Sequence, residues 1–123
     1  MARILITDNQ GSDRDILSKI FSELGHEVGT AFNGNEALRL FAESPFDLVT
    51  TDLDMPVMDG NILARRIKQK YPHTPVMMIT GHALDTESKL TKYGYADLVL
   101  SKPFSVKTIE KATEELLYFK NLQ

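Results

Sequence analysis

The most informative stretch of the sequence is residues 47–60, DLVTTDLDMPVMDG, where a short apolar run leads into an acidic loop. The apolar half predicts a buried strand, and Asp52 then lies where that strand ends. Asp54 follows two residues later, and Met55-Pro56 predicts a turn. Asp59 is a candidate N-cap for the helix that follows. Open α/β sheets bind their ligands at the carboxyl ends of strands, so this loop is the candidate functional site.

Three further short apolar runs are each followed by a polar side chain. These runs and the side chains that follow them are 3–7 with Asp8 and Asn9, 75–79 with Thr80, and 97–100 with Lys102. Continuous apolar character is typical of parallel strands that are buried on both faces. The strands therefore end in carboxylates, a hydroxyl and an ammonium group, which we expect to gather around Asp52.

Helical periodicity and capping residues occupy the intervals between these runs. The expected strands are 3–7, 26–31, 47–51, 75–79 and 97–100. The expected helices are 12–24 with Ser12 as N-cap, one from Asn33 with Glu36 in a capping box, 59–70, 84–93, and one capped by Ser105. The segment 84–93 has few apolar residues to anchor it, so low local stability is expected there. Strands that alternate with helices imply a parallel sheet with right-handed crossovers.

Length and composition limit the class of protein. A chain of 123 residues is long enough for one domain with a hydrophobic core. Its net charge of −3 gives no reason to expect direct nucleic-acid binding. The sequence has no apolar stretch long enough to cross a membrane and no signal-peptide pattern, so a cytoplasmic protein is expected. Because cysteine is absent, disulfides and Cys-based metal sites are excluded.

Five separated positions together resemble one family. In chain order they are Asp8, Asp52, Met55-Pro56 with Asp59-Gly60, Thr80, and Lys102-Pro103. This set is similar to the receiver domain of two-component response regulators, and the resemblance extends from Ala2 to about Phe119. It implies a single receiver domain over residues 1–123. It also implies a chemotaxis-type (CheY-like), flavodoxin-like doubly wound α/β fold, with a five-stranded parallel sheet of order 2-1-3-4-5 and helices on both faces.

The residue types also suit one reaction. A carboxylate can accept a phosphoryl group covalently. Because the carboxylate and the phosphoryl group are both negatively charged, positive charge must offset their repulsion. Mg²⁺ is a hard cation that suits this task, and a lysine can supply a second positive charge. The resemblance implies that Asp52 is the phosphoacceptor, with Thr80 and Lys102 contacting the phosphoryl group. It implies that Mg²⁺ is held by Asp8, Asn9, Asp52 and the backbone carbonyl of Asp54, whose side chain is an alternative ligand.

The sequence departs from the family pattern at two positions. Asn9 stands where the family usually has a second acid that binds the metal, so weaker Mg²⁺ binding is expected. Val99 stands where the family usually has the Tyr or Phe that acts as a rotating switch. His82 occupies a variable position that influences hydrolysis of the acyl phosphate in the family. The resemblance also implies a cis peptide bond between Lys102 and Pro103.

The resemblance implies that a sensor histidine kinase or a phosphotransfer protein donates the phosphoryl group. An output domain or partner protein would then bind the face formed by helix 84–93, strand 97–100 and the helix after Ser105. Such a domain is an acceptor with slow autodephosphorylation and does not turn over a substrate. The alternatives are a pseudo-receiver that binds partners without phosphorylation, which Asn9 and Val99 favour, and a metal-dependent phosphatase using Asp52-Leu53-Asp54 as an Asp-x-Asp motif. The kinase, the output and the oligomeric state do not follow from the sequence.

Overall fold

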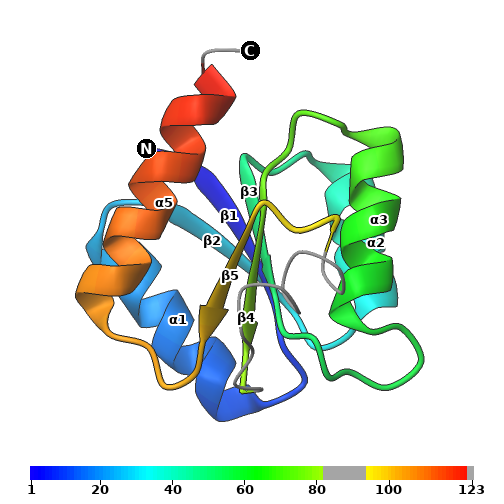
Figure 1. Ribbon diagram of the computed structural model, residues 1–123, viewed down its shortest axis with the longest axis horizontal. Coiled ribbons are helices and arrows are strands. Elements are labelled where there is room, and N and C mark those ends of the chain that lie inside the picture. Colours follow the sequence, from blue (N-terminus) through cyan, green and yellow to red (C-terminus); the bar gives the residue numbers. More distant parts are fainter. Residues whose placement is uncertain (82–93, 122–123) are drawn as a thin grey trace.

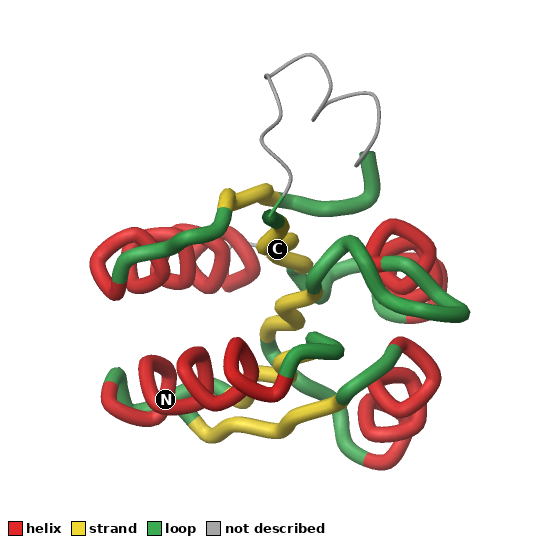
Figure 2. The backbone as a smooth tube through the Cα atoms, turned by 90° about the horizontal axis from the view of Figure 1, so that it is seen from below, coloured by secondary structure: helices red, strands yellow, loops and turns green. Residues whose placement is uncertain are grey.

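A parallel sheet lies between two layers of helices in the computed structural model, which describes residues 1–81 and 94–121, with side chains to Tyr118. The strands are β1 (Arg3–Thr7), β2 (Glu27–Ala31), β3 (Leu48–Thr51), β4 (Val76–Thr80) and β5 (Leu98–Ser101). The helices are α1 (Gly11–Glu23), α2 (Gly34–Glu43), α3 (Gly60–Lys70) and α5 (Val106–Asn121). Helices α1 and α5 cover one face of the sheet, and α2 and α3 cover the other (Figures 1 and 2).

The strand order is β2-β1-β3-β4-β5, and every neighbouring pair is parallel, which confirms the predicted topology. The segment 84–93, for which a helix was predicted, lies outside the described residues, as does His82. Among the described residues, no helix combines the length and the apolar character needed to cross a membrane.

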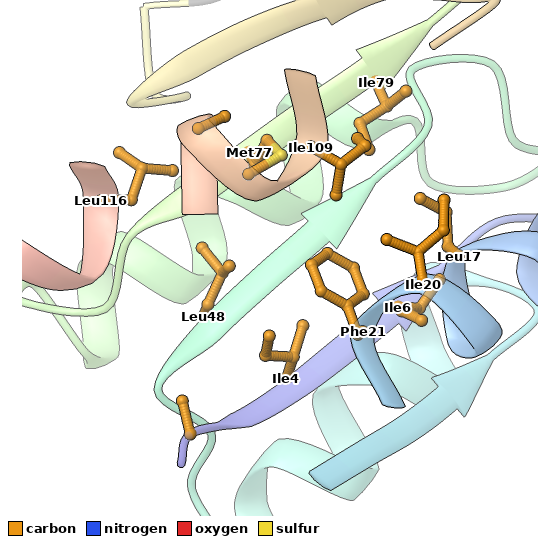
Figure 3. Close-up of a cluster of buried hydrophobic side chains, with 12 residues drawn as sticks. Ile4, Ile6, Leu17, Ile20, Phe21, Leu48, Met77, Ile79, Ile109 and Leu116 are labelled. Carbon is orange, nitrogen blue, oxygen red and sulfur yellow. The ribbon is translucent and has the colours of Figure 1, made fainter. Parts of the chain in front are cut away.

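Side chains that point alternately to the two faces of the sheet divide the hydrophobic core into two clusters. Ile4 and Ile6 of β1 point to the face covered by α1 and α5, where they pack with Phe21 and Ile109 (Figure 3). Leu5, between them, belongs to the cluster on the opposite face, under α2 and α3. Successive side chains of a strand point to opposite faces, so a strand with apolar residues at every position contributes to both cores.

The ends of the elements confirm most of the predicted caps. The side chains of Asn33 and Asp59 accept hydrogen bonds from backbone N–H groups three residues later, at 2.8 and 2.9 Å. Ser105 Oγ accepts one from the Thr108 N–H at 3.1 Å. In the predicted capping box, Glu36 accepts from the N–H of Phe32, one residue before the cap.

The prediction that Ser12 caps α1 is wrong. The helix begins earlier, at Gly11, and its N-cap position is held by Gln10 without a capping side-chain hydrogen bond. Strands β2 and β3 begin one residue later than predicted, and β4 and β5 are displaced by one residue. These shifts are small, but they place Thr80 inside its strand rather than after it.

Candidate functional site

Two acidic residues that follow neighbouring strands meet at the carboxyl edge of the sheet. Asp8 directly follows β1 and Asp52 directly follows β3. These two strands lie side by side in the centre of the sheet, with β2 on one side and β4 on the other. The strand order reverses between β1 and β3, and ligands of open α/β sheets bind at such a reversal.

A single ammonium group joins three carboxylates at this edge. Lys102 Nζ lies 2.8 Å from Asp13 Oδ2, 3.0 Å from Asp8 Oδ2 and 3.5 Å from Asp52 Oδ2. The side chains of Asp8 and Asp52 are almost fully buried, whereas those of Lys102 and Asp13 are 17% and 19% exposed. We call these four residues the Lys102 cluster. Burial keeps water from screening the charges, so they influence one another strongly.

Burial raises the pKa of Asp52 above its ordinary value, because the ionised carboxylate loses water. The Lys102 ammonium opposes this rise, and the charge of Asp8 adds to it. Burial alone would lower the pKa of Lys102, but its hydrogen bonds to Asp13 and Asp8 and the charge of Asp52 outweigh that effect and raise it. Lys102 is therefore a permanent cation at neutral pH.

Thr80 is the last residue of β4 and is completely buried. Its backbone carbonyl accepts a hydrogen bond of 2.8 Å from the Lys102 N–H. The peptide bond between Lys102 and Pro103 is cis, as predicted. The backbone bond between Thr80 and Lys102 joins the ends of β4 and β5, so the predicted hydroxyl and ammonium residues are neighbours at this edge.

The loop after β3 is held close to α3 by tight backbone contacts. The Gly60 N–H donates to the Leu53 carbonyl at 2.8 Å, and a Cβ atom at Gly60 would collide with the Asp52 carbonyl oxygen. Within the loop, the Met58 N–H donates to the Pro56 carbonyl at 2.8 Å. Val57, between them, has a φ of 71°. An i to i+2 bond around a positive φ is the rare form of the γ-turn, and a branched residue there is strained.

The oxygen donors at the site suit a hard divalent cation. Asp8 and Asp52 supply buried carboxylates that lie close enough to share one lysine, and Asn9 and Asp54 are exposed beside them. No group of three acidic or histidine side chains close enough to hold a metal ion occurs in the part of the chain that the structure describes. Mg²⁺ commonly binds through one or two carboxylates and keeps several waters, so two carboxylates fit its requirements.

Asp13 is a member of the cluster that the sequence analysis did not identify. It lies in the first turn of α1, and its side chain reaches Lys102 from there. Its distance of five residues from Asp8 and its place at a helix start were visible in the sequence. Neither feature indicated a contact with a lysine almost ninety residues away.

Val99, at the position where the family pattern has an aromatic residue, has a small side chain that is packed against its neighbours. Val99 is partly buried and packs against a small cluster that contains Leu53 and Met78. Tyr95, the aromatic residue nearby in sequence, is 46% exposed and does not take this position. An aliphatic contact therefore stands where the family pattern predicts an aromatic ring.

Comparisons with known proteins agree with this geometry. The family model described as the response regulator receiver domain matches residues 4–114. The response regulator receiver protein CpdR of Brucella abortus is 35% identical over 117 residues, which are 95% of this chain and 98% of CpdR. The regulatory protein AtoC of Escherichia coli is 33% identical over 98% of this chain, which spans only 26% of AtoC.

A solved structure shares this fold. The receiver domain protein from Clostridium thermocellum superposes with a TM-score of 0.90 at 31% identity and covers 99% of this chain and 98% of its own. The strand order, the residues at the sheet edge and the matches over nearly the full length all point to the same family. The chain belongs to the response regulator receiver domain family of two-component systems.

Proposed function

We propose that this chain accepts a phosphoryl group on Asp52 from a phosphohistidine of a sensor histidine kinase or phosphotransfer protein. The observation that carries the proposal is the Lys102 cluster, in which a partly buried lysine lies 3.5 Å from the buried Asp52 carboxylate. The ion pair alone would be compatible with a structural role. The position at the topological switch point and the membership of the receiver family support the functional role.

In the proposed reaction, a carboxylate oxygen of Asp52 attacks the phosphorus atom of the donor. The new P–O bond forms as the P–N bond breaks, and the electron pair stays on the donor's histidine nitrogen. Lys102 offsets negative charge on the phosphoryl oxygens, and the Thr80 hydroxyl is proposed to donate a hydrogen bond to one of them. The chain is an acceptor in this account, with slow loss of the phosphoryl group to water and no substrate turnover.

Mg²⁺ would supply the additional positive charge that phosphoryl transfer between two anions requires. Asp8, Asn9, Asp52 and the backbone carbonyl of Asp54 would hold it, with the Asp54 side chain as an alternative ligand. Because Asn9 contributes an amide in place of a carboxylate, Asn9→Asp is expected to bind Mg²⁺ up to about tenfold more tightly. Equal affinities in a titration of the two proteins would show that other ligands compensate.

Phosphorylation is proposed to change the binding of an output domain or partner protein at a face that includes β5 and α5. The helix predicted at 84–93, which would complete this face, lies outside the described residues. Val99 is branched at Cβ and stiff at χ1, so it cannot swing as an aromatic ring does. The signal would then travel through the backbone after Thr80, and the shift in population would be modest.

A pseudo-receiver that binds partners without phosphorylation is the second candidate, and Asn9 and Val99 are the residues that favour it. The chain spans nearly all of CpdR but about a quarter of AtoC. Both a separate regulator and one domain of a larger protein are therefore consistent with the proposal. In either setting, phosphorylation of Asp52 distinguishes the phosphoacceptor from the pseudo-receiver.

The test is the intact mass of the protein after incubation with Mg²⁺ and a small phosphoramidate donor. One added phosphoryl group is expected on the wild type and on Asp15→Asn, an exposed carboxylate in α1. No addition is expected on Asp52→Asn or without Mg²⁺. An unlabelled wild-type protein that keeps its fold would support the pseudo-receiver, and equal labelling of Asp52→Asn would exclude Asp52 as the acceptor.

A further inference from the structure

We infer that Asp13 is a positioning residue that holds the Lys102 ammonium away from Asp52 and competes with the phosphoryl group for it. This inference rests on the proposed function and deepens it, because it assigns a role to a residue outside the predicted site. Asp13 would determine how readily the site accepts the negative charge of a phosphoryl group next to Asp8 and Asp52.

The distances show where the ammonium group is bound. Lys102 Nζ donates hydrogen bonds to Asp13 at 2.8 Å and to Asp8 at 3.0 Å. Its distance of 3.5 Å from Asp52 lies beyond the usual range for a hydrogen bond. The lysine is therefore bound by the two carboxylates on the α1 side of the site, and Asp52 receives only its longer-range attraction.

The surroundings make the lysine side chain the movable part of this arrangement. Asp8 is fixed, because its backbone N–H donates to the Ala31 carbonyl and its Oδ1 accepts from the Gln10 N–H. Asp13 is carried by the first turn of α1. The flexible stem of Lys102 has several rotatable bonds, so its ammonium can shift towards Asp52 while both aspartates stay in place.

Asp13 can lose the lysine without being left as a buried, uncompensated charge. Its side chain is 19% exposed and lines a pocket of about 380 Å³ together with Ile16, Lys102, Pro103 and Phe104. Water can solvate the carboxylate from this pocket when the ammonium moves away. A partly exposed ion pair of this kind is weak enough to exchange partners.

The negative charge of Asp13 disfavours a phosphoryl group on Asp52 in two ways. When a phosphoryl group joins Asp52, Asp13 repels the added negative charge and also retains part of the lysine's positive charge. Removing the charge of Asp13 weakens both effects, so the binding of a phosphoryl group or its mimic at Asp52 becomes more favourable. Asn at this position has nearly the same shape as Asp and keeps an oxygen that can accept from Lys102, which isolates the effect of charge.

The alternative is a purely structural role, in which Asp13 stabilises α1 through its place in the first turn. That role predicts a loss of stability in Asp13→Asn and no change in anion binding. Asp15→Asn is the matched control, because Asp15 lies on the same helix, is exposed, and undergoes the same change of charge.

The experiment measures the affinity for beryllofluoride, a mimic of the phosphoryl group, at one fixed Mg²⁺ concentration and ionic strength. Asp13→Asn is expected to bind it about threefold to tenfold more tightly than the wild type. Asp13→Glu, which restores the charge, and Asp15→Asn are both expected within about twofold of the wild type. In metal-free buffer, the ¹⁵N shift of Lys102 Nζ should change in Asp13→Asn and stay constant in Asp15→Asn.

The outcomes separate this inference from the proposed function. If the wild type binds beryllofluoride and Asp13→Asn binds it no more tightly, the inference is wrong and the proposed function stands. An equal gain in Asp13→Asn and Asp15→Asn also overturns it, because the effect is then one of net charge. If neither the wild type nor any variant binds the anion, the proposed function fails and the inference fails with it.

Discussion

Single residues in the β3–α3 loop and at the start of α3 determine how closely Asp52 approaches that helix. Gly60 has no side chain, and the Asp52 carbonyl occupies the space that a Cβ atom would need. Three residues earlier, Val57 adopts a positive φ although its side chain is 92% exposed and makes little packing contact. The loop therefore combines a required close contact with a strained residue, as is common beside functional sites.

Gly60→Ala is expected to lower the free energy of unfolding by about 2–3 kcal/mol, because the added methyl group collides with backbone atoms that cannot rotate away. The control is Gly11→Ala in α1, where a new Cβ would meet only the end of the Arg14 side chain at 3.4 Å. That variant should be unchanged or more stable by up to about 1 kcal/mol. Chemical denaturation of both variants tests this, and equal stabilities would contradict the close contact.

Val57→Asn is expected to raise the free energy of unfolding by about 1 kcal/mol, since Asn tolerates a positive φ much better than a β-branched residue does. Val57→Thr is the matched control, because it makes the surface more polar but keeps the branched Cβ. Thermal unfolding should show a gain for Asn and none for Thr. A similar gain in both variants would attribute the effect to polarity instead of backbone strain.

His26 is expected to make stability depend on pH. Its Nδ1 accepts a hydrogen bond from the Ala2 N–H at 3.1 Å, which requires the neutral imidazole. Burial, together with the nearby terminal amino group, lowers the pKa of His26 below its ordinary value of 6.5. The unfolded chain then binds more protons than the folded chain as the pH falls through 6.5, so the stability of the folded state decreases over that range.

The variant His26→Asn keeps an acceptor near the Ala2 N–H and cannot titrate in this range. Denaturation at a series of pH values should therefore show a smaller loss of stability below pH 6.5 in the variant than in the wild type. Identical profiles for the two proteins would mean that other groups cause the pH dependence.

The residue scale is also where the sequence was least informative. Asp8, Asp52, Thr80 and Lys102 could be located because each follows an apolar run. Asp13 could not, because its contact with Lys102 depends on how α1 leaves β1 and on the path of a chain almost ninety residues away. Rare backbone conformations such as that of Val57 are likewise set by the surrounding loop and leave no signal in the residue type.

At the scale of elements, caps determine where most helices begin. The predicted caps Asn33 and Asp59 accept backbone hydrogen bonds, because in each case a polar residue stands just before a helical pattern. The prediction failed at α1, where Ser12 stands one residue inside the helix. Helix α1 begins at Gly11, four residues after β1 ends at Thr7, and no side-chain hydrogen bond caps it.

Replacing the cap of α2 by Asn33→Ala is expected to lower the free energy of unfolding by about 1 kcal/mol, since the Glu36 N–H loses its partner. Ser12→Ala should change the free energy of unfolding by less than about 0.5 kcal/mol, because Ser12 is exposed and does not cap the helix. Chemical denaturation distinguishes the two variants. A loss of about 1 kcal/mol in Ser12→Ala would restore Ser12 as a cap.

At the scale of the whole molecule, the parallel order of the sheet explains why distant residues meet. Strands β1, β3 and β4 are neighbours and point the same way, so the residues at their carboxyl ends share one edge. The fold class and strand order could be predicted because alternating strands and helices allow few topologies. The detailed charge balance at the edge could not, because it depends on distances of a few tenths of an ångström around Lys102.

The central claim is that Asp52 carries the phosphoryl group, and the most direct measurement identifies the modified residue in the wild-type protein. After incubation with Mg²⁺ and a phosphoramidate donor, borohydride reduces an acyl phosphate to an alcohol and releases phosphate, which converts the modified aspartate to homoserine. Peptide sequencing by mass spectrometry then locates the change without any substitution that could disturb the fold. Homoserine at position 52 alone is the predicted result. Homoserine at Asp8, Asp13 or Asp54 instead, or at no position, would contradict the account.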